Sequence, residues 1–269
     1  MHIVVCIKQV PDTTQARIDP KTNTLIREGM PTIVNPYDLH ALEEGVRIKE
    51  EYGGKVTVLT MGPPQAKDAI REGISHGCDE GILLTDRAFA GSDTLATSYV
   101  LSEAIKRVDL DEKVDLVICG KQSIDGDTAQ VGPGIAQRLD LSQLTYVIKV
   151  RSIDLKKNSM IVERQLEDGR QIVEARMPAL MTVVKEINET RYSSLSNLIK
   201  AAKYEPAVWN QEVLGLDTTK IGLKGSPTTV RKIFAPPPRE AGEIINNEGE
   251  SSKEVAEKLL KLLIEKEVI

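Results

Sequence analysis

The chain has 269 residues, enough for one large α/β domain or two smaller ones. A net charge of −5, no basic run and only 3% aromatic residues argue against nucleic-acid binding. No apolar run approaches the roughly 20 residues of a membrane span, and no secretory leader is visible, so we expect a cytoplasmic location.

The cysteine and histidine residues show no spacing typical of a metal site or a disulfide framework. Cys6, Cys78 and Cys119 are far apart without a C-x-x-C pair, and the histidines form no ligand cluster. No nucleophile–base pair is visible either. We therefore expect neither a metal site nor a catalytic residue in this chain.

The first half of the chain alternates strand signals with helix signals. This alternation predicts an α/β fold with a doubly wound, mainly parallel sheet. A small hairpin is predicted within residues 16–34. The predicted strands are Ile3–Ile7, Lys55–Thr60, Glu80–Thr85 and Val114–Cys119, and the helices run from Pro36 (capped by Asn35) to Gly53, over Gln65–Ser75, from Asp93 through Lys106 and over Val131–Leu139.

The second half predicts a β-rich back part and then an arm. Four strand signals without room for helices between them predict antiparallel strands on the same sheet. Residues 203–240 hold no clear element, and Ser251 with Glu254 predicts the capping box of a final helix. We expect a nucleotide-binding domain over residues 1–202 and an extended arm over 203–269, packing on its own domain or on another subunit. The four strands are Thr145–Val150, Met160–Leu166, Gln171–Ala175 and Leu180–Val184.

The stretch from Leu116 to Leu139 combines a buried strand, a polar loop with glycine and a helix. Parallel sheets bind phosphate groups at such a junction, so it predicts a nucleotide site. It has no P-loop frame, Gln137 replaces the third glycine of a dinucleotide fingerprint, and Ala136 replaces the glutamate of an EF-hand. A surface loop without a ligand is the alternative.

Several blocks of sequence together resemble one family over essentially the full length. They are similar to the beta subunit of electron transfer flavoprotein. The family's diagnostic pattern is matched at Val162–Arg164, Glu167–Gly169, Gln171–Val173 and Pro178–Thr182, and further similar blocks are VCIKQVPD, VNPYD, TMGPPQA and GKQSIDGDTAQVGP.

This resemblance implies an adenine nucleotide α-hydrolase-like sheet with an arm that embraces an alpha subunit carrying FAD. The beta subunit of such carriers binds either structural AMP or, in electron-bifurcating members, a second FAD. Bifurcating members take a hydride from NADH and send one electron to ferredoxin and the other, through the alpha-subunit FAD, to a flavin dehydrogenase. The dehydrogenase could be of the lactate, acyl-CoA or enoyl-CoA type.

The resemblance of the loop to that of the bifurcating group implies FAD rather than AMP. The non-bifurcating form IDDD-x-N-Q-T-G is bulkier than the loop found here, where Gly126 and Ala129 are small. Small residues would leave volume for the riboflavin end of FAD beyond the position of AMP. Asp38 after Asn35-Pro36-Tyr37 also resembles the bifurcating group.

The resemblance also implies site residues. Cys6, Asn35, Asp38 and Met61 are expected at the adenosine end, and the loop from Gly120 to Val131 around the ribose and pyrophosphate. Asp125 and Asp127 would accept hydrogen bonds from ribose or adenine, Thr128 and Gln130 would donate to phosphate, and Lys121 would supply a positive charge. The full expected set is Cys6, Asn35, Asp38, Met61, Gly62, Gly120, Lys121, Gln122, Asp125, Gly126, Asp127, Thr128, Ala129, Gln130 and Val131.

Tyr192 to Ile199 corresponds to the family's loop for the partner dehydrogenase. Leu195, within the polar run RYSSLSN, is the expected anchor, with Tyr192 and Leu198 beside it. Two other classes compete with this interpretation, a nucleotide-sensing module without a redox role and an adenylating enzyme. The adenylating enzyme would need a glycine cluster after the first strand, and Cys6–Asp12 has none.

Overall fold

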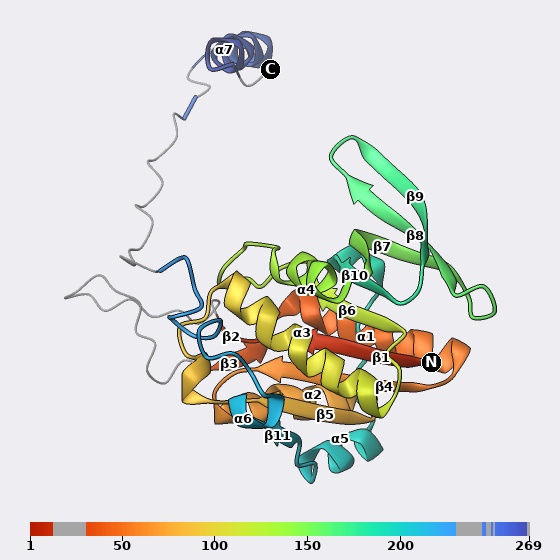
Figure 1. Ribbon diagram of the computed structural model, residues 1–269. Coiled ribbons are helices and arrows are strands. Elements are labelled where there is room, and N and C mark those ends of the chain that lie inside the picture. The colour runs from red at the N-terminus through yellow and green to blue at the C-terminus, as the bar shows by residue number, and fades with distance from the viewer. Residues whose placement is uncertain (13–30, 230–243, 246–248, 250, 268–269) are drawn as a thin grey trace. The chain divides into compact units, whose positions relative to one another are not determined.

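The computed structural model describes residues 1–12, 31–229, 244–245, 249 and 251–267. The chain divides into two compact units, Met1–Ile233 and Phe234–Ile269. The first unit is built on a mixed sheet whose elements are labelled in Figure 1. The strands of the first unit are β1 (His2–Ile7), β2 (Gln9–Pro11), β3 (Thr32–Val34), β4 (Lys55–Met61), β5 (Glu80–Leu84), β6 (Leu116–Gly120), β7 (Ser142–Asp154), β8 (Ser159–Leu166), β9 (Gly169–Arg176), β10 (Ala179–Val183) and β11 (Ala207–Trp209), of which β2 and β3 form a separate two-stranded sheet.

Along the chain, the helices of the first unit alternate with these strands or follow them, and a further helix lies in the second unit. The α-helices are α1 (Pro36–Tyr52), α2 (Lys67–His76), α3 (Thr94–Asp111), α4 (Val131–Leu139), α5 (Leu195–Ala202), α6 (Gln211–Leu214) and α7 (Ser252–Glu265), and the 3-10 turns are η2 (Pro64–Ala66), η3 (Arg87–Phe89) and η4 (Lys185–Ile187).

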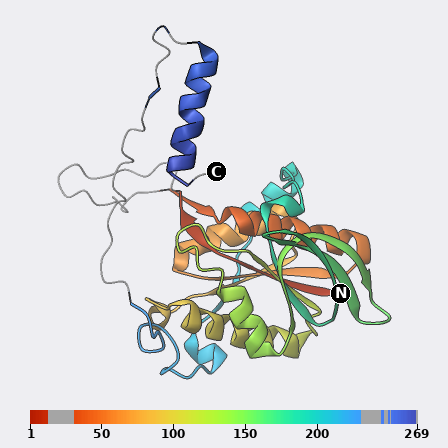
Figure 2. The same ribbon diagram turned by 90° about the horizontal axis from the view of Figure 1, so that it is seen from above.

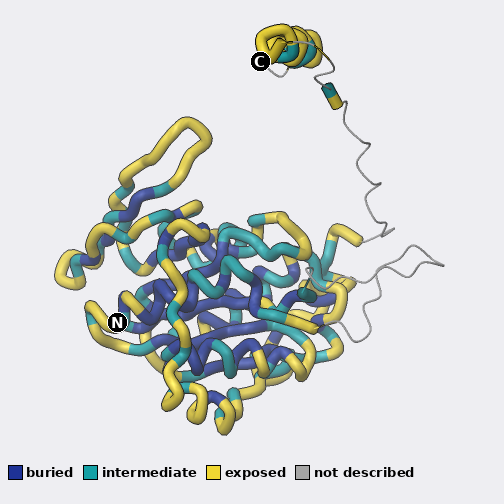
Figure 3. Tube along the Cα trace, turned by 180° about the vertical axis from the view of Figure 1, so that it is seen from behind, coloured by how far each residue is buried: buried dark blue, intermediate teal, exposed yellow. Residues whose placement is uncertain are grey.

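The main sheet has nine strands in the order β11-β5-β4-β1-β6-β10-β7-β8-β9. Its central strands are buried along their whole length, as a sheet covered on both faces requires. Ile3 and Val5 pack with α1 and α2, whereas Val4 and Cys6 pack with α3 and α4. Figure 2 shows α1 and α3 on opposite sides of the sheet. In Figure 3 the centre of the sheet is buried, whereas the end of the β8–β9 hairpin is exposed. The predicted fold class is confirmed.

The order of the back strands differs from the prediction. Of the four strands predicted there, only β7, β8 and β9 pair antiparallel, whereas β10 lies between β6 and β7 and runs parallel to both. All five residues of β10 are buried, so this apolar strand has to lie inside the sheet rather than at its edge.

The prediction that residues 203–240 hold no element was wrong for the described part, residues 203–229. Residues 207–209 form β11, which extends the sheet beside β5, and Leu216 and Ile221 are buried in the core. A strand of three residues is too short to give a periodic signal. Helix α5 also went unpredicted, although Ser194 caps it through a hydrogen bond from Asn197 N.

Two other predictions concern the final helix and residues 16–34. The capping box of Ser251 and Glu254 is confirmed at the start of α7. The hairpin expected over residues 16–34 falls mostly on 13–30, outside the described residues, and Thr32–Val34 pairs instead with Gln9–Pro11. None of the helices in the described part of the chain combines the length and apolarity that crossing a membrane requires.

Candidate functional site

The strand order changes direction between β1 and β6, and α/β sheets have their binding crevice at the carboxyl edge beside such a point. From β1 the chain continues to β4 on one side, and β6 lies on the other side of β1. Loops that leave neighbouring parallel strands in opposite directions open a space between them, and α/β sheets bind their ligands there. The loop after β1 starts at Lys8, and the loop after β6 is the predicted loop 121–130.

The side chain of Asn35 holds the loop after β6 in place through two hydrogen bonds. Its side chain is completely buried, Nδ2 donates to Gln122 O at 2.8 Å, and Oδ1 accepts from Ile124 N at 3.1 Å. Asn35 stands at the predicted N-cap position of α1, but its side chain makes no cap hydrogen bond. The amide is therefore used to order the loop.

Asp38, in the first turn of α1, joins the two loops of the crevice. Its carboxylate accepts from Lys8 N at 2.7 Å and from Gly120 N at 3.1 Å. Burial raises the pKa of the Asp38 carboxyl to about 7, while the hydrogen bonds from Asn35 and the two backbone N–H groups oppose the rise. A Cβ at Gly120 would lie 2.2 Å from Asp38 Oδ1, so this approach requires glycine.

The two loop aspartates already have partners from this chain. Both carboxylate oxygens of Asp125 lie 2.7 Å from Lys8 Nζ, and Asp127 Oδ1 accepts from Gln122 Nε2 at 2.7 Å. Burial of Asp125 acts to raise its pKa, but the hydrogen bonds from Lys8 and Ser123 lower it overall. Each carboxylate retains lone pairs that a ligand hydroxyl can use.

Lys8 was missed by the sequence analysis. It is the first residue after the first strand, at the edge where the loop after β6 also begins. That position was the signal that could have identified it, because side chains that follow neighbouring parallel strands meet at one edge.

The end of the loop presents a row of unused hydrogen-bond donors. Within the described part of the chain, the backbone N–H groups of residues 128–132 donate to no acceptor. Ala129 has φ 54° and Gln130 is in the right-handed helical region, so their N–H groups form a concave anion site. The row continues into the first turn of α4, whose helix dipole favours negative charge. This arrangement can bind a phosphate or pyrophosphate group.

Close packing holds the start of α4 in position. A Cβ at Gly132 would lie 2.6 Å from Thr182 Cγ2, and one at Gly134 would lie 2.9 Å from Ser98. Thr94 on α3 donates from Oγ1 to Gln130 Oε1 at 2.9 Å. The donor row therefore lies on a rigid base between α3 and β10.

Other predicted residues lie in the neighbouring strands, just after one of them or at the first position of the loop. Cys6 lies within β1 in register with Cys119, and Met61 and Gly62 lie at and just after the end of β4. Lys121 Nζ lies 5.0 Å from the centroid of the Tyr146 ring. The described residues contain no cluster of three or more His, Cys, Asp and Glu side chains able to hold a metal.

The residues predicted to bind a partner lie on or just before α5. Tyr192 is completely exposed, and Leu195 and Leu198 are 74% and 48% exposed. Large apolar side chains in water are a common feature of binding surfaces.

A family model described as "Electron transfer flavoprotein domain" matches residues 22–213. The chain belongs to the electron transfer flavoprotein family. It is 53% identical to "Protein FixA" of Azotobacter vinelandii, with 97% of this chain and 93% of that protein covered. It is 50% identical to "Electron transfer flavoprotein subunit beta" of Thermoanaerobacterium thermosaccharolyticum and 49% to "Caffeyl-CoA reductase-Etf complex subunit CarD" of Acetobacterium woodii, each over 100% of both chains.

The comparisons identify this flavoprotein chain as a beta subunit, which pairs with an alpha subunit and has an electron-transfer role. Electron transfer flavoproteins bind flavin or AMP. The donor row at residues 128–132 has the right chemistry for the phosphates that these two ligands share. The family also favours electron transfer over the sensing and adenylating alternatives.

Proposed function

We propose that this beta subunit binds FAD at the crevice between β1 and β6 and serves an electron-bifurcating flavoprotein. The observation that carries the proposal is the open space beside the loop. A Cβ added at Gly126 would have one neighbour within 4 Å, the Ser123 hydroxyl at 3.7 Å. This open side of the loop supports the proposal, because the riboflavin end of FAD would need room that AMP does not need. The donor row would serve the phosphates of either ligand.

The residues of this chain would hold the ligand rather than react with it. Residues 128–132 would donate to the pyrophosphate, and the lone pairs left on Asp125 and Asp127 would accept from ribose hydroxyls or adenine. Asn35 and Asp38 would keep the loop ordered before the ligand binds, which lowers the entropy cost of binding. Bound FAD would supply the redox chemistry, accepting a hydride from NADH and passing single electrons to ferredoxin and to the alpha-subunit FAD.

Similarity to relatives supports this proposal. The name of CarD assigns that protein to a caffeyl-CoA reductase complex with an electron transfer flavoprotein, and CarD is 49% identical to this chain over the full length of both. We propose a flavin dehydrogenase as the partner of this chain as well. Structural AMP in the same crevice, in a carrier that does not bifurcate, is the competing function.

An anaerobic NADH oxidation assay tests the proposal. The heterodimer of this chain and its alpha subunit is supplied with ferredoxin, with a dehydrogenase and its oxidised substrate, or with both. Bifurcation predicts rapid NADH oxidation with both acceptors and background oxidation with either one alone. Full oxidation with the dehydrogenase alone, or no reaction with NADH, would contradict it.

The surface formed by Tyr192, Leu195 and Leu198 is proposed to bind the dehydrogenase. Leu195 is the anchor because it begins α5 with most of its side chain in water. Leu195→Ala should slow electron transfer to the dehydrogenase and leave reduction of the flavin by NADH intact. Unchanged transfer would count against the anchor.

A further inference from the structure

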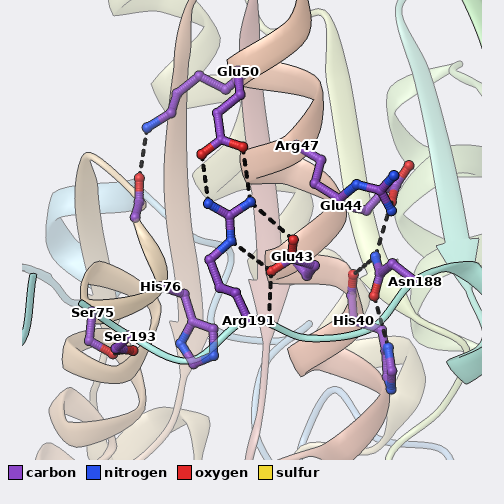
Figure 4. Close-up of polar contacts among 12 residues, drawn as sticks. His40, Glu43, Glu44, Arg47, Glu50, Ser75, His76, Asn188, Arg191 and Ser193 are labelled. Carbon is purple, nitrogen blue, oxygen red and sulfur yellow. Dashed lines mark hydrogen bonds and ion pairs between the residues drawn. The ribbon is translucent and has the colours of Figure 1, made fainter.

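A cluster of charged side chains joins α1 to residues 188–194, away from the nucleotide crevice (Figure 4). Arg191 contacts Glu43 through Nε at 2.9 Å and Nη2 at 3.0 Å, and its backbone N–H donates to the same carboxylate at 3.1 Å. It contacts Glu50 through Nη1 at 2.6 Å and Nη2 at 2.9 Å. One guanidinium thus bridges two carboxylates on α1, each through two hydrogen bonds.

This bridge, the Arg191 clamp, includes a buried charge. The Glu43 side chain is only 5% exposed, and a buried carboxylate is costly unless it is paired and hydrogen-bonded. Hydrogen bonds to Glu50 and Glu43 raise the pKa of Arg191, and the hydrogen bond from Arg191 lowers the pKa of Glu50. Moving Arg191 would leave Glu43 unpaired, so the clamp fixes the backbone at residue 191.

The same segment is fixed on both sides of the clamp. Asn188 Nδ2 donates to His40 O and to Glu44 Oε2, both at 3.0 Å, and Asn188 Oδ1 lies 2.9 Å from His40 Nδ1. Ser193 Oγ lies 2.8 Å from Ser75 Oγ on α2. Residues 188–194 have no regular secondary structure, so these side-chain contacts determine their path.

Tyr192 lies between two fixed residues and is completely exposed. The next residues lead into α5, where Leu195, Leu198 and Ile199 are exposed as well. A loose segment would turn such side chains inward, because apolar surface avoids water. We infer that the clamp instead keeps these apolar side chains exposed to solvent.

We propose that Arg191 is a positioning residue for the partner dehydrogenase. It holds Tyr192 and the start of α5 in the geometry in which the dehydrogenase binds. Because Asp38 on the same helix contacts both loops of the crevice, the clamp also keeps the docking surface in register with the nucleotide site. This inference rests on the proposed docking surface and goes beyond it by naming the residue that orders it.

Substitution by lysine separates charge from geometry. A lysine ammonium keeps the positive charge but is a single point that cannot bind two carboxylates through paired hydrogen bonds. Arg191→Lys should raise the KM of the dehydrogenase for the flavoprotein by about tenfold, with kcat changed less than about twofold. Flavin and AMP content and reduction by NADH should stay at the wild-type level.

The assay uses the heterodimer and three flavin dehydrogenases as probes, of the acyl-CoA, enoyl-CoA and lactate types. The probe with the highest kcat/KM for the wild-type heterodimer is used for the variants. Arg151→Lys is the matched control, since Arg151 on β7 also binds a nearly buried carboxylate, Glu163, at 2.8 Å and 3.2 Å. This control should leave the KM unchanged.

Three outcomes would overturn the inference. An unchanged KM in Arg191→Lys shows that the clamp does not order the surface, and an equal rise in Arg151→Lys shows general loosening. If Leu195→Ala has no effect, the docking surface is wrong and the clamp proposal falls with it. If Arg191→Lys does not assemble, Glu50→Gln replaces it, because Glu50 is the exposed partner, and its KM should rise about threefold.

Discussion

Replacing Asn35 by alanine should weaken nucleotide binding without touching the nucleotide. The buried Asn35 amide donates to Gln122 O and accepts from Ile124 N, so Asn35→Ala leaves two backbone groups of the loop without partners. Each such hydrogen bond contributes about 0.5–1.5 kcal/mol net, or about 1–3 kcal/mol for the two. If the loop must be ordered again when ligand binds, affinity falls roughly 5- to 150-fold.

Calorimetric titration of the nucleotide-free heterodimer with AMP and with FAD measures this loss. Asn210→Ala is the control, because Asn210 also accepts from a backbone N–H, that of Val213 at 2.9 Å, but caps α6 instead of the loop. It should cost about 1 kcal/mol of stability and leave the affinity unchanged. If Asn35→Ala binds AMP and FAD within twofold of the wild-type affinity, the hydrogen bonds of Asn35 do not order the loop for binding.

Three further changes test the same site. Lys8→Met removes the cation that pairs with Asp125 of the loop. In the same titration, it should lower nucleotide affinity at least about fivefold. Gly126→Asp should reduce the FAD content of the purified heterodimer and leave AMP binding intact, because the new side chain occupies the open space. Burial raises the pKa of Asp38 from its ordinary value of 3.8 to about 7 in the folded state. Its contribution to stability is therefore full below pH 3.8 and is lost as pH rises through 7. Asp38→Asn lacks this pH dependence of stability. The urea midpoint of the variant should therefore rise relative to that of the wild type between pH 4.5 and 7.5. If the difference between the two midpoints does not change with pH, the raised pKa of Asp38 is contradicted.

Local patterns predicted the parts of the fold that depend on neighbouring residues. The apolar runs of β1, β4 and β6 and the start of α1 at Pro36 were predicted because burial and capping are local. The place of β10 between β6 and β7 depends on pairing across the sheet, which periodicity does not encode. The same holds for β11, three residues that pair with β5 from far along the chain.

The candidate site divides along the same line. The loop and its helix were predicted from glycines and polar residues between Leu116 and Leu139, and α4 spans Val131–Leu139 as expected. The contact of Lys8 with Asp125 joins residues 117 positions apart, and that of Arg191 with Glu43 joins residues 148 apart. A single sequence does not show which residues pair over such distances, so these two contacts emerge only from the structure. For Lys8, the position directly after the first strand indicates the edge of the site but not the partner.

The bound nucleotides of the heterodimer test the central claim most directly. The purified complex is precipitated, and the FAD and AMP released into the supernatant are quantified per heterodimer. We expect two FAD and no AMP, because we propose that the riboflavin end of FAD lies in the open space beside Gly126. One FAD with one AMP would contradict it and make the chain the beta subunit of a carrier that does not bifurcate.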